Sequence, residues 1–129
     1  MNLTVLPKQF SVCRLPAFSP LPFWPFVGSV SSITHTADEV SIVCETHTIP
    51  DEPQSLQMKV ESGWRCVKLE GPIPFESTGV LSQLIAPLAN AKISIFAFST
   101  YDTDYVLVRT ARLGEAISVW KKAGFNVTE

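Results

Sequence analysis

Apolar and polar positions follow their clearest pattern in the second half of the chain. Trp64–Leu69 is predicted to form a strand, and Gly71-Pro72-Ile73-Pro74 after it indicates a connection. The next segment carries the apolar stripe of an amphipathic helix at positions i, i+3, i+4 and i+7, filled by Leu81, Leu84, Ile85 and Leu88. A hydroxyl side chain can accept the free N–H groups at a helix start, so Ser77 or Thr78 is the expected N-cap.

A hairpin is predicted after this helix. The apolar run Ile93–Phe98 is interrupted only by Ser94, which is typical of a strand buried on both faces. Tyr101-Asp102-Thr103 favours a turn, and the β-rich segment Tyr105–Val108 follows it. The two strands should therefore pair in an antiparallel hairpin.

The chain ends with a second predicted helix and a short strand. The helix is expected from about Leu113 to Lys122, with Gly124 as the residue that ends it, and a strand over 125–127 follows. The resulting order is strand, helix, strand, strand, helix, strand. That order is the ferredoxin-like (βαββαβ) arrangement.

The first half resembles a degenerate copy of the same plan. Strands are expected near 10–15, 31–34 and 40–44, and the proline-rich segment Phe18–Val27 occupies the place of the first helix. The segment Ile33–Val43 aligns without gaps on Phe98–Val108, which sets Glu39 against Asp104. We therefore predict an α+β fold of two tandem ferredoxin-like units, residues 1–61 and 62–129, the first degenerate, each with an antiparallel sheet and helices on one face.

An aromatic cluster lies in the proline-rich segment. Its members are Phe18, Phe23, Trp24 and Phe26. The prolines keep this segment from forming a regular helix. Its favoured interpretation is a cap over one end of the core, and the alternative is an exposed apolar patch used for dimerisation or for a partner.

Composition and charge narrow the function classes. The net charge of −2 argues against a nucleic-acid surface, which normally carries a basic excess. Prolines interrupt the longest apolar run, so no membrane span is expected, and the N-terminus lacks the pattern of a signal peptide. A cytoplasmic protein is the expectation, in which Cys13, Cys44 and Cys66 are small buried hydrophobes.

The sequence contains no catalytic or metal-binding motif. There is no G-x-S-x-G, no glycine-rich phosphate loop, and no tight ligand spacing between the histidines and cysteines. No enzyme activity, metal or cofactor is therefore expected.

Three stretches of the second half resemble a known family. Glu70–Phe75, Gly79-Val80-Leu81 and Ser94–Val108 resemble the C-terminal ACT-like domain of the family that contains the CASTOR-type cytosolic arginine sensors. Small bacterial proteins with two ACT-like units resemble the chain too. The resemblance implies a regulatory fold that binds a small-molecule amino acid and acts through a homodimer or an unidentified protein partner. The alternative is an interaction or dimerisation module that keeps the fold without a ligand.

The resemblance also implies where the ligand lies, between the first strand-helix loop and the segment Ser99–Asp104. The implied ligand-binding residues are Ser77, Thr78, Gly79, Val80, Leu81, Ser99, Thr100, Tyr101 and Asp104.

The residue types in this set suit an amino acid on physical grounds as well. Backbone N–H groups at a helix start suit a carboxylate, and Gly79 permits close approach. Asp104 suits an ammonium or a basic side chain, and Tyr101 can wall the site or stack on a cation. Purely local roles stay open, because Asp is common in hairpin turns and hydroxyl residues are common as caps.

Overall fold

The computed structural model describes the backbone of residues 1–129 and the side chains of residues 1–53 and 56–129. Two compact units emerge. The C-terminal unit comprises Met1–Pro7 together with Trp64–Glu129, and the N-terminal unit comprises Lys8–Gly63. The first seven residues thus pack with the second half of the chain. The predicted domain division at residues 61 and 62 stays a prediction.

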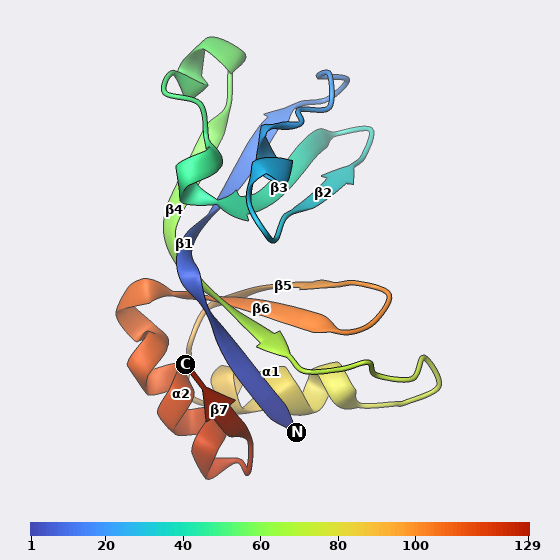
Figure 1. The fold of residues 1–129 in the computed structure, drawn as a ribbon, viewed down its shortest axis with the longest axis vertical. Coiled ribbons are helices and arrows are strands. Elements are labelled where there is room, and N and C mark those ends of the chain that lie inside the picture. Colours follow the sequence, from blue (N-terminus) through green and yellow to red (C-terminus); the bar gives the residue numbers. More distant parts are fainter. The chain divides into compact units, whose positions relative to one another are not determined.

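The C-terminal unit contains the predicted order of elements (Figure 1). Its strands and helices along the second half of the chain are β4 (Lys59–Leu69), α1 (Val80–Asn90), β5 (Ile95–Ser99), β6 (Asp104–Arg109), α2 (Leu113–Lys122) and β7 (Asn126–Thr128). The bounds of α2 match the prediction, and Gly124 follows it with φ of 98°. A left-handed residue directly after the last turn is the conformation that glycine adopts most readily.

The sheet of the C-terminal unit includes a strand that the sequence analysis did not foresee there. Its strands lie in the order β7, β1, β4, β6, β5, with β1 spanning Asn2–Pro16. The start of β1 pairs in parallel with β7, with Asn2 opposite Asn126. Leu3 and Val5 point into the core of this unit. The strand expected near 10–15 therefore begins eight residues earlier than its predicted start at Phe10.

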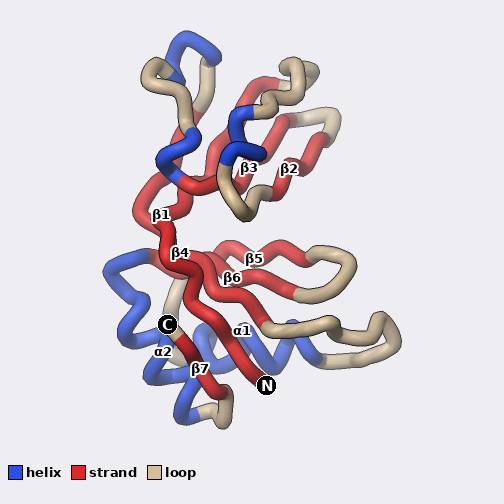
Figure 2. The backbone as a smooth tube through the Cα atoms, in the orientation of Figure 1, coloured by secondary structure: helices blue, strands red, loops and turns tan.

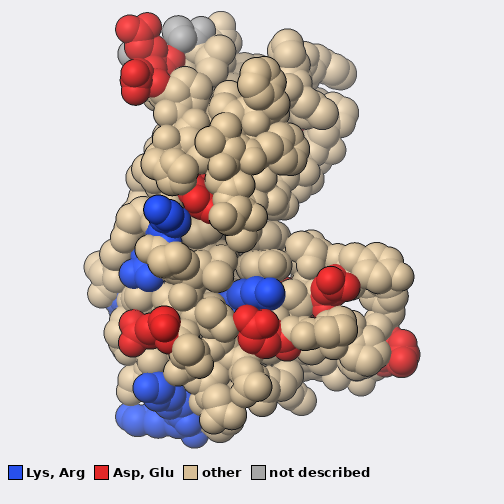
Figure 3. Space-filling model, in the orientation of Figure 1, with Lys and Arg blue, Asp and Glu red and all other residues tan. Residues whose placement is uncertain are grey.

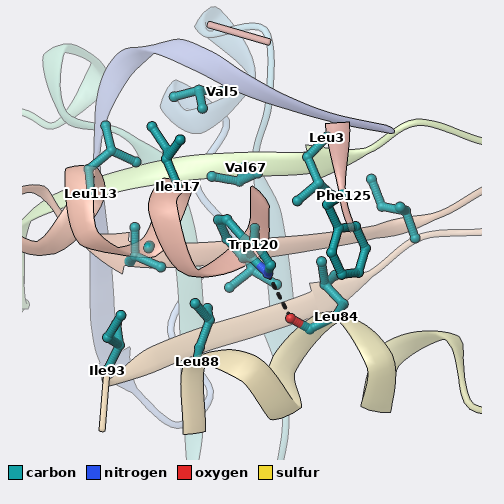
Figure 4. Packing of buried hydrophobic residues seen from close by; sticks show 14 residues of the cluster. Leu3, Val5, Val67, Leu84, Leu88, Ile93, Leu113, Ile117, Trp120 and Phe125 are labelled. Carbon is teal, nitrogen blue, oxygen red and sulfur yellow. Dashed lines mark hydrogen bonds between the residues drawn. The ribbon is translucent and has the colours of Figure 1, made fainter. Parts of the chain in front are cut away.

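One hydrophobic core joins both helices to one face of this sheet. Figure 4 shows side chains from β1, β4, α1 and α2 meeting around Trp120, which is fully buried. The indole Nε1 of Trp120 donates to the carbonyl oxygen of Leu84 in α1, at 2.8 Å. This bond ties the two helices together and satisfies the only polar atom of a large buried ring.

Two local predictions about this unit are wrong. The N-cap of α1 is Gly79, with φ of 73°, and no side chain caps the helix, so neither Ser77 nor Thr78 fills that role. The strand β5 is not buried on both faces, because it lies at the edge of the sheet, where Ala97 and Ser99 are exposed. An apolar run alone does not reveal whether a strand is central or at an edge.

The N-terminal unit has strands but short 3-10 turns in place of α-helices (Figure 2). Its strand order is β2 (Ser32–His35), β3 (Glu39–Glu45), β1, β4. The turns are η1 (Trp24–Val27), η2 (Thr46–Thr48) and η3 (Pro53–Leu56). Helices on one face therefore occur only in the C-terminal unit, among the residues described. Prolines at 20, 22 and 25 remove backbone donors and explain why no α-helix forms in that segment.

The predicted cap over the core is correct for only part of the aromatic cluster. Trp24 packs against the core of the N-terminal unit, and Pro25 is buried. Phe18 and Phe23 are each 82% exposed and Phe26 is 67% exposed. Three of the four rings consequently face outward.

A buried carboxylate organises the N-terminal unit. Glu45, 4% exposed, accepts hydrogen bonds from the backbone amides of Ser29 and Val30 at 2.8 and 3.2 Å. Its other oxygen lies 2.8 Å from Nε2 of His47. Burial by itself raises the pKa of Glu45, but the hydrogen bonds from His47, Ser29 and Val30 outweigh it and hold the pKa below its usual value. A Cβ at Gly28 would lie 2.8 Å from Cδ of this carboxylate, so a side chain there would displace Glu45.

Replacing Trp120 with Phe should lower the free energy of unfolding by about 1–3 kcal/mol, because the bond to Leu84 is lost and a gap opens in the core. Denaturant unfolding followed by fluorescence or circular dichroism measures the change. Lys121→Ala on the exposed side of the same helix is the control and should change stability by less than about 0.5 kcal/mol. Equal losses for the two variants would contradict the role assigned to Trp120.

The stability of the protein should fall at acid pH partly through Glu45. Its folded-state pKa lies below the unfolded value of about 4.3, so its contribution is present above that value and is lost as the pH falls through the folded pKa. Between about pH 5 and pH 3, the unfolding free energy of the wild type should drop more steeply than that of Glu45→Gln. Asp51→Asn, an exposed carboxylate of the same unit, should retain the wild-type slope.

Candidate ligand site

A surface hollow of about 340 Å³ lies in the C-terminal unit, between the loop before α1 and the β5–β6 turn. It brings together two segments that the sequence analysis selected separately. Every predicted ligand residue except Thr78 lines it, among the side chains described. The full lining is Ile73, Pro74, Phe75, Ser77, Gly79, Val80, Leu81, Ser99, Thr100, Tyr101, Asp102, Thr103 and Asp104.

The loop is tied to the turn by two hydrogen bonds. The amide of Ile73 donates to the carbonyl oxygen of Asp102 at 2.7 Å. The buried hydroxyl of Thr103 donates to the carbonyl oxygen of Leu69 at 2.5 Å. At Gly71 a Cβ would lie 2.9 Å from the carbonyl oxygen of Asp102, so the close approach of loop and turn requires glycine. These contacts hold the two walls of the hollow together.

One wall contains the start of α1. Gly79 adopts a left-handed conformation, and its carbonyl accepts the first helical bond, from the amide of Gln83 at 2.9 Å. Nothing within 4 Å would meet a Cβ at Gly79, so its surroundings on that side are open. The first amides of an α-helix have no partner within the helix, and their aligned dipoles make this end electropositive. The hollow therefore has a positive pole without any basic side chain.

The opposite wall carries a carboxylate. Asp104 begins β6 and pairs with Ser99 at the end of β5, whose hydroxyl donates to Oδ1 of Asp104 at 2.5 Å. Asp104 is half-buried, and its other oxygen is free of this bond. The neighbouring pair Phe98 and Tyr105 stacks with ring centroids 5.0 Å apart, which stiffens the hairpin. The bond from Ser99 therefore fixes the orientation of the Asp104 carboxylate.

An aromatic pair flanks the hollow, and the sequence analysis chose only one member of it. The rings of Phe75 and Tyr101 meet edge to face with centroids 4.6 Å apart, while they remain 70% and 80% exposed. Phe75 lay within the stretch that carried the family resemblance, but its loop position gave no sign of its contact with Tyr101. Residues of a loop meet distant partners only through tertiary structure.

Charge around the hollow is acidic. Its lining includes Asp102 and Asp104 and no Lys, Arg or His. Figure 3 shows acidic side chains near the β5–β6 turn and the loop before α1, and basic ones gathered toward the C-terminal end of α2. A molecule that carries both an anionic and a cationic group matches a site with one helix terminus and one carboxylate.

The two hairpin turns of the chain share one hydrogen-bond pattern and correct the predicted alignment. In each turn the amide of a threonine, Thr36 or Thr100, donates to the carbonyl oxygen three residues on, at 3.0 and 2.8 Å. The threonine hydroxyl accepts the amide of that same residue, Glu39 or Thr103, at 3.2 and 3.3 Å. Thr36 therefore corresponds to Thr100, so the predicted match of Glu39 with Asp104 is wrong by one position.

In this corrected register the N-terminal turn keeps a threonine but has no counterpart of Asp104 or Tyr101. The residue that corresponds to Asp104 is Val40, which is fully buried, and Ala37 corresponds to Tyr101. The sequence alone gave the wrong alignment because the predicted register and the corrected one match acidic and β-branched residue types almost equally well. The hydrogen bonds of the turns distinguish them, and so do the strand pairs His35–Val40 and Ser99–Asp104.

The remaining reactive groups do not converge on the hollow. All three cysteines are buried with free thiols, and burial raises the pKa of Cys66 to about 12. Among the described side chains, His, Cys, Asp and Glu form no group of three that could hold a metal ion. Within the same set of residues, neither helix is long and apolar enough to cross a membrane.

Two family models match the chain in separate segments. The model of the ACT domain matches residues 59–121. A second model, described as an N-terminal domain, matches residues 8–52. Both candidate walls of the hollow lie within the ACT-domain match.

Relatives of known sequence or structure agree with the first match. The cytosolic arginine sensor for mTORC1 subunit 1 of Homo sapiens is 35% identical over 86 residues, which cover 64% of this chain and 26% of that protein. The chain thus spans only 26% of the length of this curated relative. A crystal structure of a protein from Agobacterium tumefaciens is 36% identical with a TM-score of 0.87, over 98% of this chain and 90% of that chain. This chain and the Agrobacterium protein therefore belong to one family.

A more distant solved structure shows the fold alone. The ligand-free regulatory subunit of aspartate kinase from Thermus thermophilus has a TM-score of 0.65 at 7% identity, over 96% of this chain and 98% of that chain. Its likeness indicates a ferredoxin-like ACT fold here.

The close approach at Gly71 can be tested by adding one methyl group. Gly71→Ala should lower the free energy of unfolding by about 1–3 kcal/mol, because the loop must move away from the carbonyl oxygen of Asp102. Gly114→Ala is the matched control, since nothing lies within 4 Å of its added Cβ and alanine favours a helix. Unfolding in urea compares the two variants. A neutral Gly71→Ala would show that the loop does not depend on this contact.

Proposed function

This chain is an ACT-domain protein that resembles the CASTOR-type arginine sensors, and we propose that it is a non-catalytic regulatory protein that binds an amino acid. The observation that carries the proposal is the pairing of an uncapped helix start with the carboxylate of Asp104 across one hollow. An α-amino acid has one anionic and one cationic group on a single carbon. The relative from Homo sapiens is described as an arginine sensor, which supports this class of ligand.

The carboxylate of the ligand belongs at the start of α1 in this proposal. The backbone amides of Val80 and Leu81 lie in the first turn, where no side chain caps the helix. An incoming carboxylate would accept their hydrogen bonds and gain from the positive end of the helix dipole. The absence of a side chain at Gly79 leaves room for that approach.

The ammonium group belongs at Asp104. A charge-assisted bond from an ammonium to a carboxylate is about twice as strong as a neutral hydrogen bond. The hydroxyl of Ser99 holds Oδ1, which leaves the second oxygen to accept the ligand. Thr100 adds a further hydroxyl on the same wall.

The ligand side chain would then lie toward Phe75 and Tyr101. Their exposed rings form an apolar edge that can cover methylene groups or stack on a cation. Binding would also bridge the loop and the turn, because each supplies one pole of the site. That coupling gives a ligand-dependent surface which a partner protein can recognise.

We further propose that the N-terminal unit is a second, degenerate ACT-like unit, with the division at residues 1–61 and 62–129. The shared hydrogen-bond pattern of the two hairpin turns supports it. So does the strand order β2, β3, β1 in one unit against β5, β6, β4 in the other. With Val40 at the position of Asp104, this unit lacks the carboxylate that the site needs.

The proposal includes a cytoplasmic location, since the relative from Homo sapiens is described as cytosolic. The alternative is an interaction or dimerisation module of the same fold without a ligand. The open form of the hollow and the outward-facing aromatic rings support that alternative. Ligand titration separates the two.

Thermal unfolding in the presence of each of the twenty amino acids tests the proposal. A ligand that binds only the folded state raises the melting temperature, with a stabilisation of about 2.7 kcal/mol at a hundredfold excess over Kd. At least one amino acid at millimolar concentration should raise the melting temperature. The carboxamide derivative of the same amino acid should lose most of the shift, because it cannot place a negative charge at the helix start.

Two matched variants locate the binding site. Asp104→Asn should weaken binding at least tenfold, because one charge-assisted bond is lost. Asp38→Asn changes an acidic residue of the equivalent turn in the N-terminal unit and should leave binding unchanged. If no amino acid shifts the wild type, the ligand-free alternative is the better description. A shift that Asp104→Asn leaves intact would move the site elsewhere.

A further inference from the structure

The N-terminal unit exposes an unusually apolar surface, here called the proline-aromatic surface. Its members are exposed by between 45% and 82%: Phe18, Leu21, Phe23, Phe26, Val27 and Leu56. Residues 15–34 contain no Asp, Glu, Lys or Arg. Scattered exposed apolar residues are ordinary, but five of these six lie within one short uncharged segment, and three of the six line one groove, as is typical of an interaction site.

A groove of about 320 Å³ accompanies the exposed rings. Its lining is almost wholly apolar and consists of Leu15, Ser19, Pro20, Leu21, Pro22, Phe23, Trp24 and Leu56. The hydroxyl of the single polar member, Ser19, is already bonded to the carbonyl oxygen of Pro16 at 2.6 Å. A cavity of about 150 Å³ with apolar walls suffices for a benzene ring, so this groove can hold an aromatic side chain.

Phe18 stands beside this groove without lining it. The turn from Pro16 to Ser19, closed by the amide of Ser19 on the carbonyl of Pro16 at 3.2 Å, presents the ring. Phe18 has φ of 65°, a conformation that residues other than glycine seldom adopt, and its ring is 82% exposed. Prolines at 20, 22 and 25 restrict the backbone around it. The backbone that carries this ring beside the groove is therefore restricted before any partner arrives.

We propose that the proline-aromatic surface is the dimer interface of this protein, with a second copy of the chain as its partner. In a two-fold dimer the same surface meets itself, so Phe18 of each copy enters the groove of the other. The exposed members amount to roughly 700 Å² of apolar area if an aromatic side chain contributes about 200 Å². A stable interface of standard size buries about 800 Å² on each partner, so these side chains would supply most of that area.

The charge pattern also favours a second copy. A surface that meets itself brings like charges together, which opposes association unless the surface is uncharged. Residues 15–34 satisfy that condition. In a two-fold dimer the Phe18 ring of each copy can fill the groove of the other, so the surface is complementary to itself.

This proposal does not rest on the proposed amino-acid site. The proline-aromatic surface lies in the N-terminal unit, and the hollow is built from residues of the C-terminal unit. Loss of amino-acid binding would leave the dimer interface untouched, and a monomeric protein could still bind an amino acid.

Sedimentation equilibrium of the full chain, from about 1 to 100 µM, measures the dimer directly. We expect a wild-type dimer whose Kd rises about 30-fold or more in Phe18→Glu, because a ring inserted in a groove behaves as an anchor residue. Leu21→Glu, in the groove itself, should have the same effect. Circular dichroism spectra like that of the wild type would show that both variants still fold, as exposed positions allow.

Phe75→Glu is the matched control, since this ring is 70% exposed but lies in the C-terminal unit. It should leave the dimer Kd within about twofold of the wild type. A wild type that stays monomeric at 100 µM would overturn the proposal. A dimer that survives both Phe18→Glu and Leu21→Glu would overturn it as well, because the interface would then lie on another surface.

Discussion

The burial of Trp120 between α1, α2 and the sheet determines where the candidate site lies. Its indole bond to the carbonyl oxygen of Leu84 joins the two helices, and its ring fills the centre of the core. Leu84 stands just over one turn after Gly79, so whatever fixes Leu84 also fixes the first amides of α1. The positive pole of the hollow is thus a consequence of core packing some distance away.

A second constraint acts on the loop before α1. Gly71 lets the backbone approach the β5–β6 turn, and the bonds of Ile73 and Thr103 keep it there. The loop needs these tertiary contacts because it has no regular structure of its own between Leu69 and Val80. Core packing and these bonds together bring a helix start and a carboxylate to opposite walls, although about two dozen residues separate them along the chain.

The two hairpin turns show how one backbone geometry serves different purposes. Thr36 and Thr100 close their turns with the same bonds. At equivalent places after the turns lie buried Val40, the second residue of β3, and half-buried Asp104, the first residue of β6. The residue after the first turn therefore packs in the core of the N-terminal unit, whereas the residue after the second turn lines the hollow. A shared turn geometry does not by itself transfer a binding site.

The sequence by itself determined the elements of the C-terminal unit, because helix periodicity, strand composition and the glycine after α2 are local signals. It also selected most residues of the hollow, through the resemblance at Ser99–Asp104 and the loop before α1. Tertiary structure alone decided that β1 extends into the C-terminal sheet, that β5 is an edge strand, that Phe75 meets Tyr101, and that Phe18 faces outward. Each of these depends on which segments come together in space, and burial and pairing between distant residues leave no fixed spacing along the chain.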